Sequence, residues 1–216
     1  MVEDHVLFRE MMRTVCERDF GWTVVAETGL GAEAAALARQ HQPDVVVLDL
    51  HLPDRDGFNV IEDLHQLGGS IRILVVSSRC DDYTLYRVER AGVHGFLDKN
   101  TNTADVLRTA LQQVAEGRSF YSRLFQEAKI ARRRDPANFE AMLTEWERVI
   151  LGHIGQSLSD QEIGQLLGIS PNTVMTHRSK IMRKLGVSGT PKLIRYAIEH
   201  GFTQIPPSNG NRATAP

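Results

Sequence analysis

The chain has 216 residues, of which 42% are hydrophobic and 24% charged, and its formal net charge is −2; this size allows one large or two small domains, each with its own core. No apolar run is long enough to cross a membrane and the N-terminus has no basic-then-apolar secretory pattern, so we expect a cytoplasmic protein that does not contact a membrane. Cys16 and Cys80 lack the spacing of metal ligands, which argues against a disulfide framework or a zinc site.

Residues 1–117 alternate between strand and helix patterns. Apolar runs at 22–26, 45–49, 71–77 and 95–97 are typical of strands, and helical patterns occupy 6–19, 32–41, 57–67, 83–91 and 103–116. Strands that alternate with helices predict an α/β fold with a doubly wound parallel sheet.

The run from Val45 to Leu48 ends at a carboxylate, Asp49. Four consecutive apolar residues predict a central parallel strand that is buried on both faces. Ligands of open α/β sheets bind in the crevice outside the carboxyl ends of the strands, so Asp49 is a candidate site residue. The alternative is an ordinary turn acid at the end of a strand.

Polar residues occupy several predicted strand ends, namely Glu3, Asp4, Asp49, Ser77 and Lys99. Right-handed crossovers place these ends at one edge of the sheet. Clustered carboxylates favour a hard cation such as Mg²⁺, and Lys99 offers a counter-charge for phosphate oxygens. Asp49 is then the candidate carboxylate nucleophile that becomes an aspartyl-phosphate.

These residues resemble the receiver domain of two-component response regulators, through Glu3-Asp4-His5, Leu48-Asp49-Leu50-His51-Leu52-Pro53, Ser77-Ser78, Phe96 and Lys99. The resemblance implies that Asp49 accepts phosphate from a histidine kinase and that Asp49, Asp4 and the backbone carbonyl of His51 bind Mg²⁺, with help from Glu3. It also implies that Ser77 hydrogen-bonds the phosphoryl group, that Lys99 pairs with it, and that Phe96 moves inward. The alternative for Phe96 is an ordinary core aromatic.

Two departures from that family pattern affect the expected fold. Only Met1 and Val2 precede Glu3, where such receivers have a full central strand, so we expect either a start further upstream or a shortened copy with unpaired neighbouring edges. Asn100 follows Lys99, where receivers commonly have a cis proline, so the loop is expected to hold Lys99 less rigidly.

Charge and composition divide the rest of the chain. Acidic residues outnumber basic ones in 1–117, the expected receiver, whereas basic residues outnumber acidic ones in both 118–143 and 144–216. We expect 118–143 to be a linker with a short amphipathic helix around Phe120–Phe125. Arg132–Arg134 would form a solvated linker, or alternatively touch DNA phosphates. Residues 204–216 are expected to be a disordered tail.

Helix-start signals recur in 144–203. Capping-box spacings and Ser-Pro or Thr-Pro pairs predict helices over 145–154, 160–167, 171–185 and 191–200. Gly168-Ile169-Ser170 joins the second and third helices by a turn of helix-turn-helix length. The third helix carries basic residues and no acid, which favours DNA binding over a merely solvated face.

This block resembles the LuxR-type (NarL-like) helix-turn-helix, through Leu143-Thr144, Asp160-Gln161-Glu162-Ile163, Thr173-Val174, His177 and Lys184-Leu185-Gly186-Val187. The resemblance implies that Met175, Thr176 and Ser179 face the base edges. We expect modest base discrimination, because methionine cannot donate to guanine. The residues expected to grip the DNA backbone are Asn172, Thr173, Arg178, Lys180 and Lys184. Helix 191–200 would dimerise, or alternatively only pack in the core.

Together the two resemblances imply a DNA-binding transcriptional regulator that a histidine kinase switches by phosphorylating Asp49, with dimerisation as the output. One rival is a phosphorylation-independent DNA-binding regulator whose first domain is only a dimerisation module. A second rival is an aspartate-nucleophile phosphatase of the haloacid dehalogenase type. That class has a second aspartate two residues after the nucleophile, where this chain has His51. We therefore expect no enzyme beyond slow autodephosphorylation.

Overall fold

The computed structural model describes residues 1–134 and 142–203, which form two compact units. The first contains Met1–Cys80 and Leu85–Ile130, and the second contains Asp81–Thr84 and the described residues from Ala131 onward. The boundary predicted after residue 117 therefore falls inside the first unit. The predicted tail over 204–216 lies outside the described residues. No helix within the described ranges is both long enough and apolar enough to cross a membrane.

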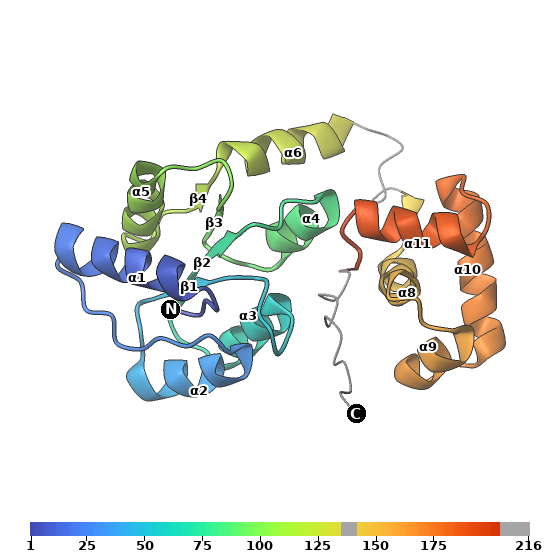
Figure 1. The fold of residues 1–216 in the computed structure, drawn as a ribbon, viewed down its shortest axis with the longest axis horizontal. Helices are drawn as coiled ribbons and strands as arrows, with labels where there is room; N and C mark the ends of the chain where they lie inside the picture. Colours follow the sequence, from blue (N-terminus) through green and yellow to red (C-terminus); the bar gives the residue numbers. More distant parts are fainter. Residues whose placement is uncertain (135–141, 204–216) are drawn as a thin grey trace, which may run out of the picture. The chain divides into compact units, whose positions relative to one another are not determined.

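The first unit has a parallel sheet with helices on both faces, which confirms the predicted α/β class (Figure 1). Within the described residues its strand order is β1-β2-β3-β4. The strands are β1 (Val45–Leu48), β2 (Arg72–Ser77), β3 (Gly95–Asp98) and β4 (Phe120–Tyr121). The helices are α1 (Val6–Thr14), the π-helical turn η1 (Val15–Asp19), α2 (Gly31–His41), α3 (Gly57–Gln66), α4 (Asp82–Arg90), α5 (Ala104–Ala115) and α6 (Arg123–Arg134).

At the N-terminus, Val2 is the residue that pairs with this sheet. Val2 pairs in parallel with both Thr28 and Leu48, and its backbone exchanges hydrogen bonds with Val47 and Asp49 at 2.9 Å each. The predicted strand over 22–26 is wrong, because these residues have no regular secondary structure. A strand exists only where a neighbour completes its hydrogen-bond ladder, and Val2 pairs with this stretch of chain at Thr28, beyond residues 22–26.

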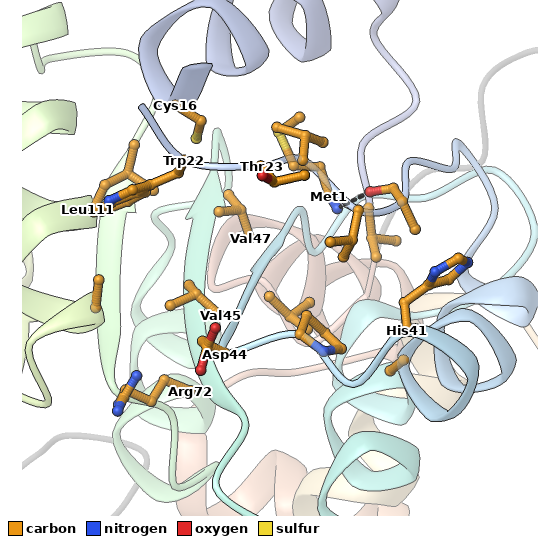
Figure 2. A pocket seen from close by; sticks show the side chains of 18 of the residues that line it. Met1, Cys16, Trp22, Thr23, His41, Asp44, Val45, Val47, Arg72 and Leu111 are labelled. Atoms are coloured by element: carbon orange, nitrogen blue, oxygen red, sulfur yellow. Dashed lines mark hydrogen bonds between the residues drawn. The ribbon is translucent and has the colours of Figure 1, made fainter. Parts of the chain in front are cut away.

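A cavity of about 770 Å³ lies between residues 22–26 and β1. Figure 2 shows its lining, with Met1 at one end, Val47 and Val45 along one side, and Asp44 and Arg72 at the other end. The segment that was predicted to be a strand forms much of the opposite wall.

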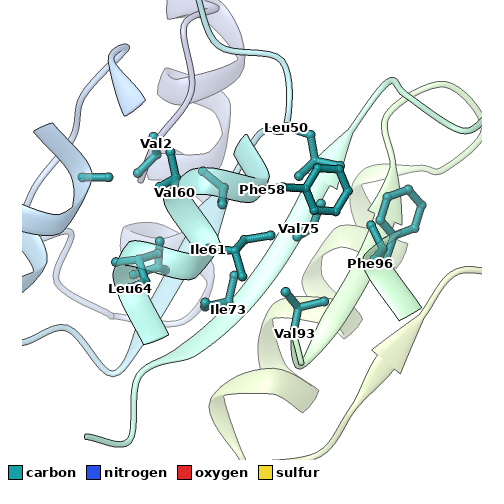
Figure 3. Packing of buried hydrophobic residues seen from close by; sticks show 14 of the residues in the cluster. Val2, Leu50, Phe58, Val60, Ile61, Leu64, Ile73, Val75, Val93 and Phe96 are labelled. Atoms are coloured by element: carbon teal, nitrogen blue, oxygen red, sulfur yellow. The ribbon is translucent and has the colours of Figure 1, made fainter. Parts of the chain in front are cut away.

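Two apolar cores cover the faces of the sheet. On one face α2 and α3 pack against the strands, and Figure 3 shows Val60, Ile61 and Leu64 of α3 over Ile73 and Val75 of β2. On the other face α1, η1 and α5 contribute a second buried cluster. Because both faces are covered, β1 and β2 are almost continuously apolar.

The segment after α5 differs from its prediction. Phe120 and Tyr121 form β4 beside β3 rather than the start of a helix. Arg132–Arg134 form the last turn of α6 rather than a linker, and Arg132 is buried while Arg133 and Arg134 are exposed. The sequence from 123 to 134 lacks glycine and proline and is rich in good helix formers, so the helix continues through the arginines.

The second unit includes α8 (Glu145–Gly155), α9 (Asp160–Leu167), α10 (Pro171–Leu185) and α11 (Thr190–Glu199). Complete capping boxes begin α8 at Thr144 and α9 at Ser159, as their spacings predict. Ser170 caps α10 ahead of Pro171. The Thr-Pro pair lies at the start of α11 as predicted, but the N-cap is Gly189 and Thr190 is already the first residue of the helix.

Candidate functional site

The carboxyl ends of the parallel strands bring the predicted acidic and basic residues together. Asp49 follows β1, Ser77 ends β2 and Lys99 follows β3, while the single paired residue Val2 places Glu3 beside them. The Lys99 N–H donates to the Ser77 carbonyl at 3.0 Å, which aligns the last two strand ends. This edge of the sheet is the candidate site.

Lys99 is the centre of the charge cluster. Its Nζ donates to Glu3 Oε2 at 2.6 Å and to Asp49 Oδ2 at 2.7 Å. Glu3 and Asp49 are 1% and 2% exposed. Lys99 also lies 4.6 Å from the centroid of the Phe8 ring, a cation–π contact. Two buried carboxylates share one ammonium, so each of them is only partly compensated.

The remaining carboxylate, Asp4, lies on the solvent side of this cluster. Its Oδ1 is buried and accepts no hydrogen bond from the described residues, although His5 Nδ1 approaches it to 3.0 Å. One ligand atom from each of Glu3, Asp4, His5 and Asp49 lies within 4.8 Å of the others. The three carboxylates of Glu3, Asp4 and Asp49 face the ammonium of Lys99, an excess charge of the size that a divalent cation compensates.

The loop after β1 fixes the direction of Asp49. The His51 N–H donates to Asp49 Oδ1 at 3.1 Å. Gly57 begins α3 directly against this loop, and a Cβ at that position would lie 2.5 Å from Leu50 Cα and 2.8 Å from the Asp49 carbonyl oxygen. Only glycine allows the helix to approach the backbone of Asp49 this closely.

Ser77 and Phe96 are both fully buried. Ser77 Oγ accepts a hydrogen bond from the Arg79 N–H at 3.3 Å. The Phe96 ring faces into the core, as Figure 3 shows, with its centroid 5.6 Å from that of Phe125. Phe125 in turn stacks on Tyr121 at 4.7 Å. In this structure Phe96 is therefore a packed core aromatic.

Side-chain hydrogen bonds that we did not predict from the sequence hold the loop that contains Lys99. The Asp98 carboxylate accepts from the Thr101 N–H at 2.8 Å and from the Thr101 hydroxyl and Asn102 Nδ2 at 2.6 and 2.5 Å. Asn100 Nδ2 donates to the Ser78 carbonyl at 3.0 Å. The buried Asp98 thus organises the turn after β3, where the departure at Asn100 predicted a looser hold on Lys99.

The second candidate site is the exposed face of α10. Gly168 adopts a left-handed conformation (φ 68°) and ends α9, and Ser170 begins α10 two residues later. Thr173 supports this start, because its N–H donates to Ser170 Oγ. The other exposed members of the predicted DNA-contacting set are Asn172, Met175, Thr176, Ser179 and Lys180. This face carries Lys180 and Arg183 without a neighbouring acid on the helix.

Two of the predicted phosphate-gripping residues pair with acids of neighbouring helices. Arg178 binds Asp160 of α9 through two nitrogens, at 2.6 and 2.9 Å. Lys184 Nζ donates to Glu147 Oε2 of α8 at 2.6 Å. Glu147 is buried and also accepts from the Thr144 N–H. Arg178 and Lys184 therefore connect the helices of this unit, a function that spacing along the chain could not reveal.

On α11, Leu193 and Ala197 are fully buried. The most extensive packing of this helix within the unit is against α8. This arrangement matches the core-packing alternative for 191–200. Dimerisation through α11 stays a prediction.

His5 is the functional candidate that the sequence left without a role. It was part of the quoted Glu3-Asp4-His5 pattern, but only the fold turns its Nδ1 toward both carboxylates, at 3.2 Å from Glu3 Oε1 and 3.0 Å from Asp4 Oδ1. Its side chain is 67% exposed, so it lies at the mouth of the cluster.

Comparisons with known proteins cover both units. Residues 1–112 match the family model described as response regulator receiver domain, and residues 141–197 match bacterial regulatory proteins of the luxR family. The response regulator protein VraR of Staphylococcus aureus is 30% identical over 203 residues, which are 94% of this chain and 97% of VraR.

Solved structures show the same fold. RcsB of Salmonella enterica serovar Typhimurium, bound to promoter P1flhDC with the phosphomimetic BeF3−, aligns with a TM-score of 0.63 at 20% identity, over 90% of this chain and 94% of RcsB. A LuxR-family two-component response regulator of Aurantimonas sp. SI85-9A1 aligns with a TM-score of 0.57 at 30% identity, over 62% of this chain and 95% of that one.

Proposed function

This chain belongs to the response regulators that join a receiver domain to a LuxR-type DNA-binding domain, and on that premise we propose that a sensor histidine kinase in the cytoplasm switches its DNA binding by phosphorylating Asp49. The observation that supports this most directly is the position of Lys99, whose ammonium binds the buried carboxylates of Asp49 and Glu3 at the ends of the strands. The family consists of transcription regulators and is not a class of enzymes.

In the proposed reaction an Asp49 carboxylate oxygen attacks the phosphorus of a phosphohistidine. The phosphorus–nitrogen bond breaks, and the histidine nitrogen takes a proton as it leaves. Lys99 neutralises charge on the phosphoryl oxygens, and the hydrogen bond from the His51 N–H keeps Asp49 oriented. The aspartyl-phosphate is later hydrolysed slowly by water, so the protein is modified rather than acting as a turnover enzyme.

The donor set fits a magnesium ion. The carboxylates of Asp4 and Asp49 and the backbone carbonyl of His51 would hold it, with Glu3 acting indirectly; the buried Asp4 Oδ1 that accepts no hydrogen bond from the described residues is an oxygen ligand of the required kind. When bound, Mg²⁺ shields the negative charge that otherwise opposes the approach of a phosphoryl group to these acids.

We further propose that the new phosphoryl group recruits Ser77, whose Oγ accepts a long hydrogen bond of 3.3 Å from the Arg79 N–H. Movement of Ser77 would leave room beneath it, and Phe96 would repack against Phe125 and Tyr121. The changed surface favours a homodimer, which presents two copies of α10 to half-sites about one helical turn of DNA apart.

For DNA contact, the exposed face of α10 is the proposed reading surface. Thr176 and Ser179 donate their hydroxyl hydrogens to the carbonyls of Asn172 and Met175, so toward a base they offer lone pairs. Asn172, Thr173 and Lys180 supply backbone contacts. Arg178 is paired with Asp160, and Lys184 is paired with Glu147. Each can contact a DNA phosphate only if it shares its charge with that acid or breaks the ion pair.

The test is to treat the full chain and Asp49→Asn with acetyl phosphate and magnesium, and to measure intact mass, oligomeric state and affinity for promoter DNA. The unchanged protein is expected to gain one phosphoryl mass, dimerise and bind more tightly. Asp49→Asn should do none of these, whereas Asp105→Asn, which changes a carboxylate that is 91% exposed, should behave as wild type.

Two outcomes would overturn the proposal in different ways. Failure of the unchanged chain to gain a phosphoryl group would favour the phosphorylation-independent regulator, in which the first unit is only a dimerisation module. Multiple turnover of small phosphate esters that is lost in Asp49→Asn would favour the aspartate-nucleophile phosphatase.

A further inference from the structure

Arg87 connects helix α4 to the loop 50–56, which follows Asp49. Its Nη1 donates to Asp56 Oδ2 at 2.9 Å, and its guanidinium lies 3.7 Å from the centroid of the Phe58 ring. Phe58 is buried in the core that Figure 3 shows. Contacts with a carboxylate and with an aromatic face together hold a planar guanidinium in one place. Arg87 therefore attaches the second turn of α4 to the start of α3.

Asp56 is joined in turn to His51 and Asp49. The backbones of His51 and Asp56 form an antiparallel bridge, and the Gly57 N–H donates to the Leu50 carbonyl at 3.1 Å. The His51 N–H donates to Asp49 Oδ1 at 3.1 Å. The second oxygen of the Asp56 carboxylate caps the N-terminus of α3. A continuous series of contacts therefore runs from Asp49 to α4.

A second anchor fixes the same loop to α2. The Asp54 carboxylate accepts from the N–H groups of Gly31 and Ala32, the first two residues of α2, at 2.8 Å each. The loop is therefore held by α2 at Asp54 and by α4 at Asp56. Because both places are anchored to helices, a change of shape around His51 is transmitted to α4 rather than absorbed within the loop.

The alternative is an ordinary surface ion pair. The side chains of Arg87 and Asp56 are 29% and 36% exposed, and pairs with such exposure contribute little to stability. The chain offers a matched case, because Arg55 and Asp63 pair at 2.7 Å with side chains that are 30% and 32% exposed. That second pair joins the loop only to α3, the helix that directly follows it. The two pairs differ in the elements that they connect, so a comparison of the two separates coupling from surface charge.

We propose that Arg87 is a positioning residue that couples α4 to the loop 50–56, so that the geometry of the magnesium site and the position of α4 change together. This inference rests on the magnesium site of the proposed function. It provides a route to α4 that is separate from Ser77, because residues 78–81 join Ser77 to the first turn of α4 and Arg87 lies on the second turn. The route requires no phosphoryl group. By linkage, a ligand that orders the loop restrains α4, and loss of Arg87 weakens binding of that ligand by the same factor.

The experiment measures amide hydrogen exchange in the full chain, with and without magnesium chloride and with no phosphate donor. Arg87→Met removes the charge and keeps an apolar side chain over Phe58. Asp56→Asn removes the charge of the partner and keeps a side-chain oxygen that caps α3. Arg87→Lys keeps the charge, and Arg55→Met is the matched control. Urea unfolding should give the same midpoint for Arg87→Met and Arg55→Met, which shows that both variants fold.

In the unchanged chain, magnesium is expected to slow exchange at Gly57, beside the loop, and at Val88 of α4. Arg87→Met and Asp56→Asn should lose the response at Val88. Both should also raise the magnesium concentration needed for half of the response at Gly57 by about two- to fivefold, the range expected of an exposed ion pair. Arg87→Lys should keep most of the response at Val88, and Arg55→Met should keep all of it.

Equal responses at Val88 in the unchanged chain and in Arg87→Met would rule the proposal out, as would equal losses in Arg87→Met and Arg55→Met. A response at neither Gly57 nor Val88 in the unchanged chain would remove the magnesium site itself, and this inference with it. Phosphorylation of Asp49 is measured separately by intact mass, so the two failures are distinguishable.

Discussion

Replacement of Lys99 by methionine tests whether the acidic cluster is held together by one ammonium. Glu3 Oε2 and Asp49 Oδ2 both lie within 2.7 Å of Lys99 Nζ, so the two oxygens are at most roughly 5 Å apart, and at an effective dielectric constant near 20 their mutual repulsion is about 3 kcal/mol. Removal of one partner from a buried charge pair typically costs about 3–5 kcal/mol. We therefore expect Lys99→Met to lower the free energy of unfolding by about 3–5 kcal/mol.

The assay is urea unfolding of the first unit within the full chain, at neutral pH, with and without magnesium. Lys129→Met is the matched control, because Lys129 pairs with Glu89 at 2.9 Å on the surface, where such a pair contributes at most about 1 kcal/mol. Magnesium at about a hundred times its dissociation constant should restore about 2.7 kcal/mol to Lys99→Met. It should stabilise wild type less, because Lys99 already occupies two carboxylates.

Equal losses in Lys99→Met and Lys129→Met, together with no response to magnesium, would refute the reasoning. That result would mean that Glu3 and Asp49 do not interact strongly through Lys99. It would also remove the electrostatic basis for a divalent ion at this edge of the sheet.

Two further predictions concern Glu147 and Gly57. Burial alone raises the pKa of Glu147, but hydrogen bonds from Lys184 and the Thr144 backbone outweigh it and hold the pKa below its ordinary value of 4.5. The stabilisation is therefore complete above pH 4.5 and is lost as the pH falls through the lowered pKa. Glu147→Gln should reduce this acid dependence of unfolding, and Glu162, whose pKa is also lowered, should keep the rest. An unchanged acid profile in Glu147→Gln would show that another carboxylate is responsible. Gly57→Ala should lower the free energy of unfolding by about 1–3 kcal/mol in urea, because its Cβ would meet the backbone of Leu50 and Asp49; a gain in stability, as at an open helix position, would contradict the close approach.

The features that the sequence predicted well depend on neighbouring residues along the chain. The apolar runs of β1 and β2, and the caps at Thr144, Ser159 and Ser170, each carry their signal within a few positions. The gathering of Glu3, Asp49 and Lys99 followed from one topological rule, that parallel strands end at a common edge.

The features that we did not predict from the sequence depend on contacts formed only in the folded chain. Residues 22–26 have strand propensity but no adjacent strand, so propensity was overridden by the missing hydrogen-bond ladder. The pairing of Lys184 with Glu147 was missed because it spans 37 positions, and the predicted DNA contact of Lys184 stays a prediction. We did not predict a structural role for Asp98, because that role depends on hydrogen bonds from Thr101 and Asn102 in the folded turn after β3.

The clamp between Arg178 and Asp160 has a consequence for how the helix-turn-helix meets its target. Because the guanidinium grips the acid through two nitrogens, the angle between α9 and α10 is set before any nucleic acid arrives. Little conformational freedom is then left to be lost on association. Arg178 also neutralises the negative charge of Asp160, which would otherwise repel the phosphates of the DNA backbone.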